Sequence, residues 1–228
     1  SATARLRELY ASRGDSQGAI ELLQREIEAA EGNNQRAALW AQVARIYRDR
    51  VKDASKARDA VEKSVLLDAT NEDAAVMLGE LHFEAGAWAD AAKHLSGRAS
   101  RAKELGREEG LGLALKYGEA LAKSGDSAKA LEAFRAAAEV APDDRDALLA
   151  VAKATYAADA WAEAKTRYDA LLKTHGKDLD EATRAAALYE FADATRRGGD
   201  NAAAIASLNE AAEAGLQGGV IDARGLHG

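Results

Sequence analysis

The sequence predicts an all-α fold built from repeated helical hairpins, and three observations support this prediction. The chain has 228 residues, of which 47% are hydrophobic and 30% are charged, a balance typical of a folded chain with a core. It contains only one proline, and long helical stretches tolerate almost none. A pattern of 34 residues recurs along the chain and is clearest over residues 111–144.

This clearest segment is expected to form two antiparallel helices joined by a tight turn. Gly118 and Ala130 would lie where the two helices cross, because small side chains let the helix axes approach. Gly125 is expected to end the first helix in the left-handed conformation. Asp126 or Ser127 would then cap the second helix.

The same segment resembles the tetratricopeptide repeat. That family combines a large residue followed by glycine, a second large residue, an A-x3-F segment, a small residue and a proline. The matching residues here are Tyr117, Gly118, Leu121, Ala130, Phe134, Ala137 and Pro142. The resemblance implies a right-handed superhelical solenoid of about six helix-turn-helix repeats, each with an A helix followed by a B helix.

Sliding this template along the chain places six repeats, which we expect to form a single solenoid over residues 1–218 before a Gly-rich tail at 219–228. The repeats lie near residues 1–36, 37–71, 72–105, 111–144, 145–178 and 185–218. The second repeat is expected to carry one extra residue in its turn. The further residues at 106–110 and 179–184 are expected to extend a helix or to loosen a connection.

A longer period of 73 to 74 residues relates pairs of repeats. The segment 87–91, with Trp88 at its second position, recurs as the segment 160–164 with Trp161. Such pairing resembles the long repeat arrays of large bacterial scaffold proteins. The chain is therefore expected to be a segment of such a protein, with further repeats removed or with a tail that folds back.

Charge and composition narrow the classes of partner. The net charge of −7 argues against nucleic acid, because phosphate contacts need an excess of Lys and Arg. The lack of cysteine excludes disulfides and thiolate metal sites. No run of 18 apolar residues occurs, so no membrane insertion is expected. We expect a cytoplasmic protein, and the composition leaves the periplasm open as well.

The sequence predicts no catalytic, cofactor-binding or metal-binding residues, and therefore no enzyme. No metal-ligand spacing relates the four histidines, His82, His94, His175 and His227. The carboxylates that cluster at 143–146 and 178–181 stand at predicted helix starts, where acidic residues favour the positive end of the helix dipole. One extended helix with a solvated, salt-bridged face is expected to carry the basic residues Arg98, Arg101, Lys103 and Arg107.

The tetratricopeptide resemblance also implies where a partner would bind. In that family the A helices line a concave surface, mainly at positions 2, 5, 9, 12 and 13 of each repeat. Carried over to this sequence, the expected partner-binding residues are Arg45, Arg48, Glu80, Phe83, Glu119, Lys123, Lys153, Tyr156, Tyr189, Asp193 and Arg196. Position 5 never carries Lys and position 9 never carries Asn, which argues against a clamp for chaperone carboxylates. Phe83 and Tyr156 would either anchor a partner or pack between adjacent A helices.

The implied function is that of a protein–protein interaction scaffold or adaptor, with a partner protein or peptide bound in the concave groove. A small GTPase, a component of a secretion, pilus or motility machine, and a second copy of the chain are the partner classes considered. Two alternatives stay open, namely a regulatory repeat domain of a larger enzyme or transcription factor, and a self-assembling scaffold.

Overall fold

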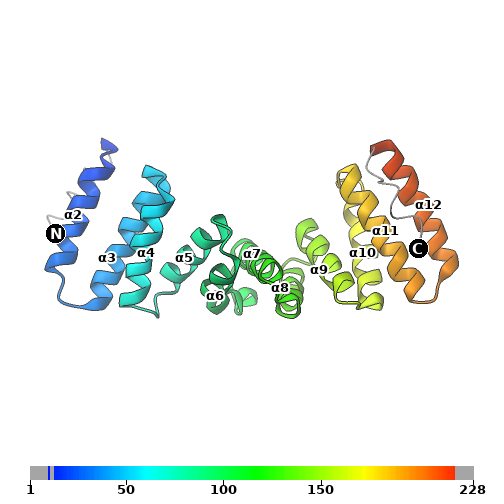
Figure 1. Ribbon diagram of the computed structural model, residues 1–228, viewed down its shortest axis with the longest axis horizontal. Coiled ribbons are helices and arrows are strands. Elements are labelled where there is room, and N and C mark those ends of the chain that lie inside the picture. Colours follow the sequence, from blue (N-terminus) through cyan, green and yellow to red (C-terminus); the bar gives the residue numbers. More distant parts are fainter. Residues whose placement is uncertain (1–9, 11–12, 219–228) are drawn as a thin grey trace. The chain divides into compact units, whose positions relative to one another are not determined.

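The computed structural model describes residue 10 and residues 13–218, and each regular element within them is a helix (Figure 1). The chain forms two compact units, Ser1–Arg98 and Ala99–Gly228, which we call unit 1 and unit 2 and describe separately. Most of the A helix predicted for the first repeat, and the Gly-rich tail predicted at 219–228, lie outside the described residues.

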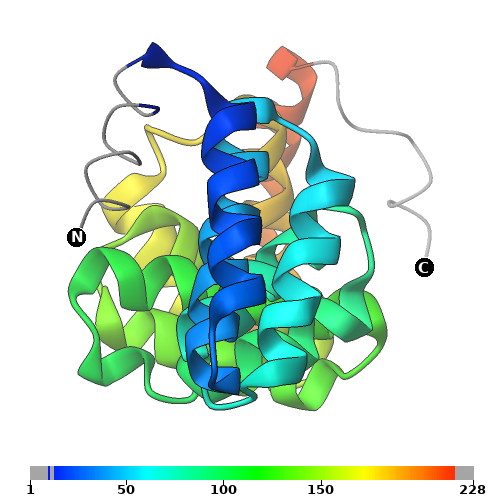
Figure 2. The same ribbon diagram turned by 90° about the vertical axis from the view of Figure 1, so that its left-hand side faces the viewer.

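Unit 1 contains a B helix followed by two hairpins. Its elements are α2 (Ser16–Ala29), α3 (Asn33–Ile46), the π-helical turn η1 (Tyr47–Val51), α4 (Ala54–Leu67), α5 (Glu72–Glu84) and α6 (Trp88–Ala99). The helix α2, dark blue and nearest the viewer in Figure 2, packs against α3, which in turn packs against α4. The core of this unit includes Ile20, Leu23, Val43, Val61 and Leu78, each at most 2% exposed.

Unit 2 contains three hairpins preceded by a short helical turn. Its elements are η2 (Ala102–Glu104), α7 (Arg107–Ser124), α8 (Ser127–Val140), α9 (Arg145–Ala157), α10 (Trp161–His175), α11 (Glu181–Arg197) and α12 (Asn201–Gly218). The helices pack as the consecutive pairs α7 with α8, α9 with α10 and α11 with α12 (Figure 1). Around α9, α10 and α11 the core includes Leu148, Ala152, Tyr168 and Leu171.

Local polar chemistry sets the helix ends. Several helices begin where an Asp or Asn side chain accepts a hydrogen bond from a backbone N–H group of the first turn. These capping residues are Asp15, Asp53, Asn71, Asp126, Asp144 and Asp180. The turn predicted at the centre of 111–144 is confirmed, since Gly125 ends α7 with a φ of 93° and Asp126 accepts from the N–H of Lys129. Asp144 and Asp180 confirm that the two acidic clusters cap helices.

Glycines let the two helices of a hairpin approach closely, as predicted for Gly118. A Cβ atom on Gly118 would lie 2.6 Å from the ring of Phe134 on α8. A Cβ atom on Gly79 of α5 would lie 2.8 Å from the side chain of Leu95 on α6. Larger residues at these two positions would therefore force the helices of each hairpin apart.

The extra residues between pairs of repeats lengthen the A helices that follow them. α7 spans 18 residues and α11 spans 17, whereas α9 spans 13. At the start of α7, Gly110 allows η2 to lie directly on the helix, because a Cβ atom there would collide with the carbonyl oxygen of Ala102. Ala102 is thereby buried with Ala114 and Ala137.

Two details predicted from the sequence are wrong. The basic residues from Arg98 to Arg107 do not share one extended helix, because α6 ends at Ala99 and α7 begins at Arg107. The burial of Ala102 draws the chain inward between them. The extra residue of the second repeat is taken up by the π-helical turn η1, which holds more residues per turn than an α-helix, and Lys52 then adopts a left-handed φ of 61°.

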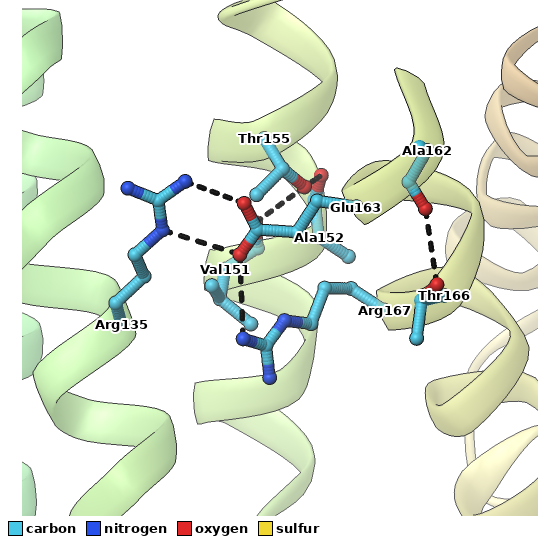
Figure 3. A network of polar contacts seen from close by, with 8 residues as sticks. All are labelled: Arg135, Val151, Ala152, Thr155, Ala162, Glu163, Thr166 and Arg167. Atoms are coloured by element: carbon cyan, nitrogen blue, oxygen red, sulfur yellow. Dashed lines mark hydrogen bonds and ion pairs between the residues drawn. The ribbon is translucent and has the colours of Figure 1, made fainter. Parts of the chain in front are cut away.

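Polar contacts join the B helices of consecutive repeats in unit 2 (Figure 3). Arg135 of α8 donates two hydrogen bonds to the carboxylate of Glu163 on α10, one of them 3.2 Å long. Arg167, one turn along α10, donates to the same carboxylate at 3.3 Å. The hydrogen bonds from Arg135 are the main cause that holds the pKa of Glu163 below its ordinary value, and the bond from Arg167 acts in the same direction. The hairpins are thus joined by specific side chains as well as by the core.

Candidate binding surface

In unit 1 the predicted partner-binding residues are carried by α3, η1 and α5. Arg48 donates to Glu80 over 3.4 Å, with about a third of each side chain exposed, and it also donates to Asp49 over 2.8 Å. The bond to Asp49, with the charges of Asp49 and Glu80, raises the pKa of Arg48 against the opposing effect of burial. Arg45 is exposed one turn earlier on α3. The structure therefore joins Arg48 to Glu80 and leaves Arg45 at the surface.

The predicted aromatic anchor of unit 1 packs within its own hairpin. Phe83 of α5 meets Trp88 of α6 edge to face, with ring centroids 5.2 Å apart and an angle of 81° between the rings. This geometry is favourable for aromatic pairs and fixes the Phe83 ring, which is partly buried. Phe83 thus contributes to the hairpin as well as to the surface of α5.

In unit 2 the predicted residues Tyr156, Asp193 and Arg196 come together between α9 and α11. The hydroxyl of Tyr156 donates to Asp193 over 2.8 Å. The same carboxylate accepts from Arg196 over 2.7 Å and from Arg197 over 2.7 Å. Burial of Asp193 acts to raise its pKa, but the hydrogen bonds from Arg196, Tyr156 and Arg197 outweigh burial and the pKa is lowered. Asp193 is therefore a charged carboxylate held by hydrogen bonds from three residues.

A tryptophan completes this group of residues. The ring of Trp161, at the start of α10, lies edge-on to Tyr156 with centroids 5.3 Å apart. The guanidinium of Arg197 lies 4.3 Å from the centroid of the Trp161 ring, a cation–π contact. We call Tyr156, Trp161, Asp193, Arg196 and Arg197 the Tyr156 cluster.

Two predicted residues extend the surface of the cluster. Tyr189 precedes Asp193 by one turn of α11 and is 42% exposed. Lys153 precedes Tyr156 by about one turn of α9 and is also exposed. Both residues lie on the helix face that carries the Tyr156 cluster, so an aromatic ring and a cation border it.

The remaining predicted residues, Glu119 and Lys123, lie on α7. They pair with each other over 2.7 Å as an i,i+4 ion pair, with about half of each side chain exposed. Asp193 and Arg197 form the same kind of i,i+4 pair on α11, at the same two repeat positions. The acid at position 9 and the base at position 13 thus recur in two repeats of unit 2.

One inter-repeat contact is found in both units. Counted from the repeat starts, Arg48 and Tyr156 occupy position 12, while Glu80 and Asp193 occupy position 9 of the next repeat. In each case the position-12 donor binds the position-9 carboxylate. The contact joins the A helices of consecutive repeats, so these two positions stabilise the stacking.

Trp161 was not among the site residues predicted from the sequence, whereas Arg197 stands at position 13 of its repeat, one of the positions expected to line the concave surface. The recurrence of Trp88 as Trp161 was a visible signal for the first. The spacing of Arg197 four residues after Asp193 was a signal for the second, because residues at i and i+4 of a helix are neighbours. The sequence does not reveal their contact with each other, which depends on how α10 lies beside α11.

The side of α11 that faces away from Asp193 borders a pocket of about 610 Å³. The pocket lies between the C-terminal part of α10, the loop that follows it, α11 and α12. Its lining includes the apolar residues Leu172 and Phe191 and the cations Lys173 and Lys177. This pocket is distinct from the surface around the Tyr156 cluster.

Within residues 10 and 13–218, no group of three or more His, Asp or Glu side chains is placed to hold a metal ion. Over the same part of the chain, no helix combines the length and apolar character needed to cross a membrane.

Comparison with known proteins identifies the fold. Residues 111–154 match the tetratricopeptide repeat family, and no curated protein sequence matches the chain. The solved structure of YrrB, described as a TPR protein with an unusual peptide-binding site, is 17% identical, with 86% of this chain and 93% of YrrB covered and a TM-score of 0.63. MamA is 20% identical, with 77% and 91% covered and a TM-score of 0.56. PilF of Pseudomonas aeruginosa is 18% identical, with 95% and 88% covered and a TM-score of 0.53. At these identities the likeness is one of fold.

Proposed function

Because this chain is a protein of the tetratricopeptide repeat family, we propose that it is an interaction scaffold that binds a partner protein or peptide on the A-helix face of unit 2. Tetratricopeptide repeats are protein–protein interaction folds. The binding face we propose consists of the Tyr156 cluster together with Lys153 and Tyr189. No catalytic role is assigned to the chain.

The observation that carries this proposal is the exposure of aromatic and arginine side chains around a fixed polar centre. Tyr189 is 42% exposed. The side chains of Arg196 and Arg197 are 56% and 44% exposed, although both bind Asp193. A guanidinium has five N–H donors, and Asp193 engages two from Arg196 and one from Arg197, so each arginine keeps donors for a partner. Tyrosine and arginine, with tryptophan, are enriched at the few interface positions that carry most of the binding energy.

Pre-organisation supports the same face. The contacts with Asp193 and Trp161 hold Arg197 in one place before any partner arrives. A side chain that is already ordered loses less conformational entropy on binding. YrrB, which shares the fold, is described as having a peptide-binding site, and a peptide or protein segment is the partner class we propose here.

Affinity capture with the full chain from a lysate of its source cell, followed by rebinding of the purified partner, tests this proposal. The test variants are Tyr189→Ala and Arg196→Ala/Arg197→Ala. The matched control is Lys173→Ala/Lys177→Ala, which also removes two cations from unit 2 but at the pocket on the other side of α11. Circular dichroism first establishes that each variant remains helical.

The proposal expects the partner to be lost or weakened by both test variants and retained by the control. Loss with the control alone would place the partner at the pocket and contradict the proposal. Equal retention by all variants would also contradict it. If only further copies of the chain are captured, the self-assembling scaffold considered from the sequence is the better account.

A further inference from the structure

Two histidines stack on each other inside the α5/α6 hairpin of unit 1. The rings of His82 on α5 and His94 on α6 have centroids 5.6 Å apart and planes within 11° of parallel. The close approach of the two helices explains this contact, because Gly79 lies against Leu95 one turn from His82 and one residue from His94. The hairpin thus brings two titratable rings together where its helices are closest.

The stack leaves one buried ring nitrogen without a hydrogen bond. The Nδ1 atom of His82 is buried and has no hydrogen-bond partner among the described residues. A protonated imidazole carries an N–H donor on both nitrogens, so protonation of His82 would leave a buried donor unsatisfied. Leu95 and Ala91, which are fully buried on α6, supply no acceptor side chain. Two imidazolium rings at this separation would also repel each other.

The charged groups that face His94 do not cancel the effect of burial. Burial is the largest influence and lowers the pKa of His94 below 6.5, and the neighbouring His82 and Lys93 lower it further. Asp90 on α6 and Glu62 on α4 act in the opposite direction but are outweighed. The neutral form of His94 is therefore the one that the folded hairpin favours.

We propose that the His82–His94 pair is a pH-sensitive latch that holds α6 on α5 when both rings are neutral and loosens the hairpin on acidification. The Phe83–Trp88 contact joins the same two helices, so loosening the hairpin would also release the aromatic ring that fixes Phe83 on the surface of α5. The latch does not depend on the proposed binding function, because its effect on the hairpin exists without a partner.

The direction of the pH effect follows from linkage. Because the pKa of His94 is lower in the folded chain than its ordinary value of 6.5, the unfolded chain binds the proton more readily below that pH. The contribution to stability is complete above pH 6.5 and is lost as the pH falls through the folded-state pKa. The chain contains an internal control, because the equivalent positions 73 residues later in the α9/α10 hairpin are Thr155 and Arg167.

Hydrogen exchange of the full chain at pH 7.5 and pH 5.5, corrected for the intrinsic pH dependence of exchange, tests the latch. We expect protection over residues 72–99 to fall at the lower pH, because the lowered pKa of His94 makes the folded hairpin less stable in acid, and protection over residues 145–175 to stay constant. The variant His82→Gln/His94→Gln should abolish the fall, whereas His175→Gln, in unit 2, should retain it. An equal fall in both hairpins, or a fall that persists in the double variant, would overturn the proposal.

An NMR titration of the histidine rings provides a test that needs no variant. The latch requires at least one of the two stacked rings to titrate clearly below pH 6.5 in the native chain, and hairpin signals to shift in the same range. If both rings titrate independently at the ordinary value, the pair is a solvated contact and the proposal is wrong.

Discussion

The hydroxyl of Tyr156 donates a 2.8 Å hydrogen bond to Asp193 and thereby joins the A helices of two consecutive repeats. Asp193 is only 8% exposed, yet it faces the surface on which Arg196 and Arg197 are about half exposed. The bond therefore belongs both to the stacking of the repeats and to the proposed binding face. A contact with the same repeat positions, from Arg48 to Glu80, occurs in unit 1.

Replacement of Tyr156 by phenylalanine should lower the free energy of unfolding by about 1 kcal/mol, because it removes one donor from a nearly buried carboxylate while it keeps the ring. Urea denaturation followed by circular dichroism measures the change. Tyr189→Phe is the matched control, since it removes a hydroxyl from an exposed ring and should change stability by less than about 0.5 kcal/mol. Equal effects of the two variants would show that the bond to Asp193 contributes nothing to stacking.

Two glycines of α7 should respond in opposite ways to alanine. Gly118→Ala should destabilise unit 2 by about 1–3 kcal/mol, because its Cβ would lie 2.6 Å from the Phe134 ring. Gly112→Ala should stabilise it by up to about 1 kcal/mol, because the added Cβ would meet nothing within 4 Å apart from neighbouring residues and its own helix backbone, and alanine favours the helix. Thermal unfolding of the two variants measures both signs. A stabilising Gly118→Ala would contradict the close crossing of α7 and α8.

The left-handed residue after the π-helical turn of unit 1 offers a stabilising substitution. Lys52 has a φ of 61°, which strains a residue with a Cβ atom, so Lys52→Gly should raise the free energy of unfolding by about 0.5–1 kcal/mol. Gly125→Ala is the reciprocal change at a φ of 93° and should lower it by a similar amount. Chemical denaturation measures both changes, and destabilisation by Lys52→Gly would argue against the left-handed turn.

The Arg135–Glu163 contact between B helices should show a small, salt-sensitive coupling. Both side chains are substantially exposed, so a double-mutant cycle with Arg135→Ala and Glu163→Ala should give a coupling of about 0.5–1 kcal/mol. The coupling should shrink in 1 M NaCl, because salt screens exposed charges. A coupling of zero at low salt would mean that the contact does not stabilise the stack.

The local features of the fold could be predicted from the sequence. The turn at Gly125 and Asp126 depends on residues that are adjacent in the chain, and their chemistry permits few other conformations. The crossing at Gly118 depends on the spacing within a single repeat, which the repeat pattern preserves. Such features need only short-range information, and the structure confirms them.

Features that depend on contacts between elements could not be predicted in the same way. The break between α6 and α7 results from the burial of Ala102 with Ala114 and Ala137, residues that the sequence does not place together. The bond between Tyr156 and Asp193 spans 37 positions and requires α9 and α11 to be adjacent. The stack of His82 on His94 likewise needs the helix approach at Gly79, whereas each histidine alone gives no signal.

Calorimetric titration of the purified partner, once capture has identified it, tests the central claim most directly. We expect Arg196→Ala/Arg197→Ala to raise the dissociation constant at least about tenfold, which corresponds to a loss of about 1.4 kcal/mol of binding free energy. We expect Lys173→Ala/Lys177→Ala to leave the dissociation constant unchanged. A dissociation constant that is the same for the wild type and the Arg196→Ala/Arg197→Ala variant would contradict the assignment of the binding face to the Tyr156 cluster.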